Sequence, residues 1–170
     1  MKQNSEKIIE EAARDRCWAD LRDNKDEISQ LMMGKKKINE KDFILFFQCA
    51  VVVLAEINMY EDEFLDFDTE TKRLLEDKSK TGALMRNLRE VGYWRDIVDE
   101  NLPMEKKMNA INNFRKNMWA FMALKKERLI EVVDAYPGIK KEKEMYILMQ
   151  CVALTALEIE LRGIEIELLY

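Results

Sequence analysis

Two stretches of this sequence nearly repeat each other, 102 residues apart. The first runs Gln-Cys-Ala-Val-Val-Val-Leu-Ala-Glu-Ile over residues 48–57, and the second runs Gln-Cys-Val-Ala-Leu-Thr-Ala-Leu-Glu-Ile over residues 150–159. From residue 40 to 57, six of eighteen positions are identical to their counterparts, where ordinary residue usage gives roughly one by chance. The match predicts an internal duplication. The alternative is that two amphipathic helices have converged on a similar composition.

If the turn before this helix is allowed to differ in length by one residue, the match extends backwards into a preceding helix at an offset of 101 residues. Identical residues then face each other at Arg14 and Arg115, at Trp18 and Trp119, and at Lys25 and Lys126. A unit of two helices therefore occurs twice. We predict an all-α helical bundle forming one domain over residues 1–170, in which hairpins 1–66 and 103–170 are joined by a unique helical connector, 67–102.

The composition agrees with long helices in a soluble chain. Charged residues make up 36% of the 170 residues and hydrophobic residues 48%, with only five Gly and two Pro. The net charge of −5 provides no basic field for nucleic acid or for an anionic membrane. The longest apolar stretch, residues 43–57, is shorter than the ~20 residues that a membrane span requires. We therefore expect a cytoplasmic protein without membrane insertion, and nucleic acid is an unfavoured partner.

Local signals place the helices. We expect helices from Ser5 to Met33, with a possible kink in the polar run 22–27, and from a capped start at Asn39 to Phe64. The second of these is apolar all round from residue 43 to 54 and should be central and buried. We expect connector helices over 70–78 and 83–100, a long helix from 103 to 136, and a last helix from 140.

Residues 157–168 have two possible structures. Their alternation of apolar and charged residues also fits a hairpin that turns at Arg162-Gly163. A hairpin would set Glu158 opposite Glu167, two like charges. A helix would allow Glu158 to pair with Arg162 at a cost of ~1 kcal/mol for interior Gly163. We therefore favour the helix.

The sequence contains no His. Ser-His and Cys-His catalytic pairs, the usual zinc sites and imidazole acid–base catalysis are therefore excluded. Cys17, Cys49 and Cys151 are too far apart for a Cys-x-x-Cys site, so we interpret them as structural thiols. We expect no catalytic residue, no cofactor and no bound metal, and hence no enzyme.

One enzymatic alternative needs only carboxylates. The acidic cluster over residues 56–68 could hold Mg²⁺ through Glu56, Glu63 and Asp66, as in a Mg-dependent all-α nucleotide pyrophosphohydrolase. This cluster lacks the Glu-Glu-x-x-Glu motif that such enzymes show. A solvated acidic helix end is the simpler interpretation.

Lysines lie at equivalent turns in the two hairpins. Each group precedes a helix N-terminus, where free amides could join the lysines in binding an anion or nucleic acid. Solvated, solubilising turns are the simpler interpretation. The lysines are Lys35, Lys36, Lys37, Lys140 and Lys141.

A non-enzymatic interaction or adaptor protein is the function that we expect. Two hairpins bury only part of their apolar faces on each other, so a groove or dimer face should remain for a protein partner or for a second copy. The candidate residues are aromatic residues and Met on the connector and the third long helix. They are Tyr93, Trp94, Met118, Trp119, Phe121 and Met122.

Overall fold

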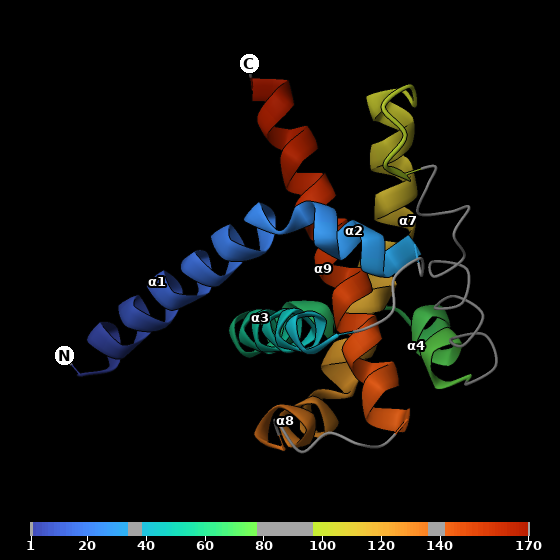
Figure 1. The fold of residues 1–170 in the computed structure, drawn as a ribbon. Helices are drawn as coiled ribbons and strands as arrows, with labels where there is room; N and C mark the ends of the chain where they lie inside the picture. Colours follow the sequence, from blue (N-terminus) through green and yellow to red (C-terminus); the bar gives the residue numbers. More distant parts are fainter. Residues whose placement is uncertain (1, 34–38, 78–96, 136–141, 170) are drawn as a thin grey trace.

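A computed structural model describes residues 2–33, 39–77, 97–135 and 142–169. Every regular element in these ranges is an α-helix, which confirms the predicted all-α bundle. Figure 1 shows the helices crossing at steep angles around a common centre. Their bounds are α1 Lys2–Asp23, α2 Lys25–Met33, α3 Glu40–Phe64, α4 Thr69–Glu76, α7 Met104–Leu124, α8 Lys126–Asp134 and α9 Glu142–Leu169.

Both long helices that precede the repeated stretches are broken, and they break at corresponding positions. The first break is at Asn24, whose side chain donates a hydrogen bond to the Asp20 carbonyl (2.8 Å), and it lies within the predicted kink. The second is at Lys125, whose amide bonds to the Met122 carbonyl three residues earlier (3.0 Å). The predicted helix from 103 to 136 is therefore two helices, α7 and α8. The first of them, α7, continues through Arg115 without a break.

The capped start predicted for α3 is confirmed. The Asn39 side chain accepts a hydrogen bond from the Asp42 amide, and the Asp42 carboxylate accepts one from the Asn39 amide, both at 2.9 Å. This reciprocal capping box satisfies two amide groups that a helix start otherwise leaves without partners. α3 ends at Phe64, one residue before its C-cap Leu65.

The last element is a helix through Gly163, as predicted, and not a hairpin. The predicted Glu158–Arg162 pair does not form. Glu158 instead binds Arg115 and Trp119 on α7, while the Arg162 guanidinium covers the ring of Trp18 on α1. Tertiary partners therefore replace the local one.

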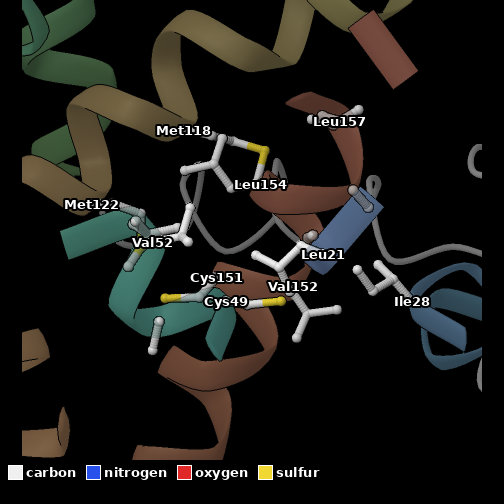
Figure 2. Packing of buried hydrophobic residues seen from close by; sticks show 14 of the residues in the cluster. Leu21, Ile28, Cys49, Val52, Met118, Met122, Cys151, Val152, Leu154 and Leu157 are labelled. Carbon is white, nitrogen blue, oxygen red and sulfur yellow. The ribbon is translucent and has the colours of Figure 1, made fainter. Parts of the chain in front are cut away.

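α3 and α9 cross at the centre of the molecule and pack more extensively on each other than any other pair of helices. Cys49 and Cys151 lie at this crossing, close to each other, and are fully buried as free thiols (Figure 2). Burial raises the pKa of Cys49 to about 12 and that of Cys151 well above its usual value. These two thiols have the structural environment that the sequence predicted.

The remaining helices pack in a reciprocal pattern. α1 packs on α3 and α7 packs on α9, so each first helix contacts the central helix of its own hairpin. After the breaks, α2 packs on α9 and α8 packs on α3, so each second segment crosses to the central helix of the other hairpin. Residues 1–66 and 103–170 therefore form one interlocked core.

The two central helices are buried to different extents. Every residue of α9 from Gln150 to Ile159 is buried. α3 was predicted to be buried all round, and this is wrong for one face. Ile44 is 50% exposed, and Val51 and Leu54 are half-buried. An apolar stripe of α3 therefore remains in contact with solvent.

The connector packs on the second hairpin. α4 matches the predicted helix 70–78 closely and contacts α7. Leu75 and Ile97 are buried, and Ile97 belongs to the main hydrophobic core. Most of the predicted helix 83–100 lies outside the described residues.

Candidate functional site

A cluster of polar side chains around the buried Glu158 joins α7 to α9, with Arg115 at its exposed edge. The Trp119 indole nitrogen donates a hydrogen bond to Oε1 of Glu158 (2.7 Å). Arg115 donates through Nε to the same oxygen and through a terminal nitrogen to Oε2 (3.4 Å). The Glu158 side chain is only 5% exposed. Both of its oxygens therefore have donors, which a buried carboxylate requires.

The corresponding residues of the first hairpin form a looser version of this cluster. The Trp18 indole nitrogen donates to Oε1 of Glu56 (2.8 Å). Arg14 forms an ion pair with that oxygen, but its Nε is 3.6 Å away, beyond hydrogen-bond distance. Burial opposes the charge of Arg14, while a hydrogen bond to Tyr60 and the charge of Glu56 favour it, and the net effect raises the pKa of Arg14. Arg14 therefore stays protonated.

Each Trp is covered by the central helix of the opposite hairpin. The Arg162 guanidinium on α9 lies 4.3 Å from the Trp18 ring centroid, a cation–π contact. The Phe64 ring on α3 stacks on Trp119, with centroids 4.7 Å apart and an interplanar angle of 14°. The two clusters are therefore tied together across the middle of the molecule.

A cavity of about 290 Å³ lies between the two clusters. Both Arg-Trp-Glu sets line it, and Arg162, Tyr60, Glu63 and Phe64 complete its wall. Its surface is mostly polar. The cavity thus combines guanidinium and carboxylate groups with aromatic rings in one place.

A second hollow is apolar and lies between α1 and α3. This α1–α3 groove has a volume of about 360 Å³ and continues the exposed stripe of α3. Its lining residues are mostly small and aliphatic. They are Ala13, Arg14, Cys17, Val51, Val52, Leu54, Ala55, Asn58 and Met59.

The matching face between α7 and α9 is closed. Cys17 of the groove corresponds to Met118, which is 1% exposed, and Ala55 corresponds to Leu157, which is fully buried. The residue at the groove position is the smaller one in both pairs. Val51 and Leu54 of the groove are instead larger than their counterparts Ala153 and Ala156, so side-chain size alone does not decide which face is open.

Three of the predicted protein-binding residues lie in the core. Met118, Trp119 and Met122 are buried in the core, so they cannot supply an exposed patch. Their helical spacing reflects core packing. Phe121 is half-buried beneath the Lys125 ammonium group, 5.2 Å from its ring centroid. Tyr93 and Trp94 lie outside the described residues.

The residues of the magnesium hypothesis are only partly brought together. Glu56 and Glu63 both line the central cavity, whereas Asp66 does not. Glu56 is already engaged by Trp18 and Arg14. In the part of the chain that the structure describes, no group of three acidic or Cys side chains is placed to hold a metal ion. The lysines at 35–37 and 140–141 lie outside the described residues.

Sequence reasoning did not identify the two Arg-Trp-Glu clusters as a site. Arg14 and Trp18 were noted only as markers of the repeat, and Glu56 only as a possible metal ligand. A signal was nevertheless present: a carboxylate recurs at the same place in both apolar stretches, at Glu56 and Glu158. A recurrent charge on a core helix implies a buried partner.

No protein-family model matches this sequence, and neither a curated protein nor a solved structure matches it. Among the described residues, α3 alone has the length and composition of a membrane-crossing helix, with a mean hydropathy of 1.9 over its most apolar window. It packs against α1, α7, α8 and α9. The core helix of a water-soluble protein has the same composition, so this is weak support for a membrane span.

Proposed function

We propose that this protein is a non-enzymatic interaction module that binds an apolar helix of a partner protein along α3. The observation that carries the proposal is the unequal burial of the two central helices. α9 is buried from Gln150 to Ile159, whereas α3 keeps an exposed apolar stripe beside the α1–α3 groove. Exposed apolar surface that is continuous with a groove is typical of interaction sites.

The shape of the groove favours a helix as the occupant. Ala13, Cys17 and Ala55 leave a furrow between two helices, and bulky side chains on one face of a third helix fit such a furrow. The connector, which occurs once in the chain, packs on the second hairpin through α4. No described residue of the connector lines the α1–α3 groove, so this groove can accept a helix from another molecule.

The self-match and the geometry together support a duplicated origin for the two hairpins. The broken first helices, the Trp-to-Glu hydrogen bonds and the reciprocal packing all recur at offsets of 101 or 102 residues. Two unrelated hairpins have no reason to repeat buried polar contacts. We infer that two equivalent hairpins diverged when the connector packed on one of them.

The test places a photo-crosslinking residue at Val51, with a matched control at exposed Lys72 on α4. Crosslinking in the native cell should yield a discrete partner at residue 51 and not at residue 72. Leu54→Asp, introduced alongside, should abolish that product because a buried carboxylate without a partner is costly in an apolar interface. Equal products at both positions, or no effect of Leu54→Asp, would count against the proposal.

Light scattering and vesicle flotation identify other occupants of the face. A dimer that Leu54→Asp dissociates would assign the α3 face to a second copy of the chain. Flotation with vesicles that depends on Leu54 would assign it to a lipid surface. A monomer that does not bind vesicles, combined with the crosslinking result above, is the outcome expected for a partner helix.

A further inference from the structure

We propose that the central cavity binds a small oxyanion, a carboxylate or a phosphate group, through Arg162 and Arg14. This site shares Arg14 with the α1–α3 groove, but it does not depend on the interaction proposed for the groove. The inference rests on the cavity, on the charges along its wall, and on the different extents to which its three guanidinium groups are paired with acceptors of the protein.

The Arg115–Glu158 pair in the cavity wall has no free charge to offer. Glu158 accepts hydrogen bonds from Trp119 and from two nitrogens of Arg115. This is a fork-like pair in which the guanidinium and the carboxylate neutralise each other. A ligand would have to break this pair in order to bind Arg115. We therefore expect Arg115 to line the cavity without binding the anion.

Arg14 is held less firmly. Its Nε is buried and has no hydrogen-bond partner in the protein, because Oε1 of Glu56 is 3.6 Å away. Its terminal nitrogens contact the Met59 sulfur (2.8 Å) and the exposed Asp15 carboxylate (3.4 Å), and its guanidinium also interacts with the Tyr60 hydroxyl at the cavity wall. A thioether is a weak acceptor. A stronger acceptor in the cavity would therefore draw the Arg14 guanidinium towards itself.

Arg162 provides the second positive group. One face of its guanidinium lies on the Trp18 ring, and no carboxylate in the described part of the chain pairs with it. Stacking occupies a guanidinium face but leaves its N–H groups free at the edge, where they bind planar oxyanions in pairs. Arg162 lies on the Trp18 ring, and Arg14 and Trp18 both approach Oε1 of Glu56. Both guanidinium groups therefore lie at the same end of the cavity.

The remaining wall limits what the ligand is. Glu63 is exposed and solvated, and of the three carboxylates along the wall it alone has no protein donor. Its charge disfavours an anion only weakly, because water screens it. Tyr60 and Phe64 add aromatic surface, and a cavity of about 290 Å³ has space for a phosphate or carboxylate with a small ring attached.

Tryptophan fluorescence detects binding because Arg162 lies on Trp18. The probes are inorganic phosphate, phenyl phosphate and phenylacetate, each compared with sodium chloride at the same ionic strength. At least one probe should change the emission with saturation, and the three together distinguish a phosphate head, a carboxylate head and a contribution from the ring. If no probe gives a saturable change beyond that of chloride, the proposal fails.

Variants locate the site. Arg162→Gln should weaken binding about tenfold or more, because a charge-assisted hydrogen-bonded pair is lost. Arg162→Lys keeps the charge but loses the planar arrangement of N–H groups, so it should bind with intermediate strength. This variant replaces Arg162→Gln in the test if the Gln variant does not fold. The matched control, Arg128→Gln, removes an exposed arginine from α8 and should leave the affinity unchanged. Equal affinity in wild type and both Arg162 variants would overturn the assignment.

Glu63→Gln tests the sign of the ligand charge. Removing a negative charge from the cavity wall should strengthen the binding of an anion or leave it unchanged. Weaker binding in this variant would show that the Glu63 carboxylate attracts a positively charged group of the ligand, which would overturn the proposal.

Discussion

At the scale of single residues, the packing of the first and central helices depends on the partners of two buried carboxylates. Glu56 and Glu158 lie on the two most apolar helices, and each accepts a hydrogen bond from an indole nitrogen and pairs with an arginine. A buried carboxylate is costly without such partners. The same partners fix the register between the first helix and the central helix of each hairpin.

Glu158→Ala should lower the free energy of unfolding by about 1–3 kcal/mol, because the Trp119 N–H is left buried without an acceptor. Glu158→Gln should cost less, since an amide oxygen still accepts from the indole. Chemical denaturation of both variants measures the difference, with exposed Glu127→Ala as control. Equal losses for Ala and Gln would show that the hydrogen bond to Trp119 contributes nothing.

The pKa of Cys49 predicts a sensitivity to alkaline pH. Folding raises this pKa from 9.0 to about 12 by burial, so the unfolded chain loses the proton first. The stabilising contribution is complete below pH 9 and decreases as the pH rises from there towards about 12. Cys49→Ala should therefore flatten the dependence of unfolding free energy on pH above 9.

Cys17→Ala provides the comparison, because Cys17 is half-buried and outside the α3–α9 crossing. Denaturation curves at several alkaline pH values should have the wild-type slope in this variant. If the Cys49 variant also keeps the wild-type slope, burial of that thiol is not linked to stability.

At the scale of elements, local sequence decides where helices start and break, and packing decides which faces they bury. The Asn39–Asp42 box starts α3, while polar residues permit the breaks at Asn24 and Lys125. α9 continues through Gly163 despite its low helix propensity. Tertiary contacts of Glu158 and Arg162, which both precede Gly163, hold the adjoining turn of α9 in place.

Gly163→Ala should stabilise the protein by about 1 kcal/mol, because it removes the entropic cost of glycine within a helix. The position is exposed, and an added Cβ would have no atom within 4 Å. Thermal and chemical unfolding measure the gain. In the hairpin that we rejected, glycine would be needed at the turn and the same substitution would destabilise the protein.

At the scale of the whole molecule, two matching hairpins end in different environments. In the described part of the chain, the connector helix α4 packs on α7 of the second hairpin, α9 is buried from Gln150 to Ile159, and the apolar stripe of α3 stays partly in contact with solvent. An interlocked core with one uncovered face is the arrangement on which the interaction proposal rests.

Two Leu→Ala substitutions measure the difference in burial between α9 and α3. Leu154→Ala, at a fully buried site on α9, should cost about 2–5 kcal/mol of unfolding free energy. Leu54→Ala, at a half-buried position of α3, should cost less, about 1–2 kcal/mol, because part of that side chain already contacts water. Similar costs at the two positions would mean that the α3 face is covered in solution.

The sequence by itself determined the helical class, the capped start of α3, the kink near Asn24 and the burial of Cys49, since each follows from local propensity or periodicity. It did not determine which of two similar apolar helices would be closed. That depends on long-range packing between helices, which periodicity does not encode. The cavity likewise needs Arg14 and Arg162, far apart in sequence, to meet at Trp18. Only the crossing of α1, α3, α7 and α9 brings these charges and rings together, because buried polar groups must find partners wherever the fold provides them.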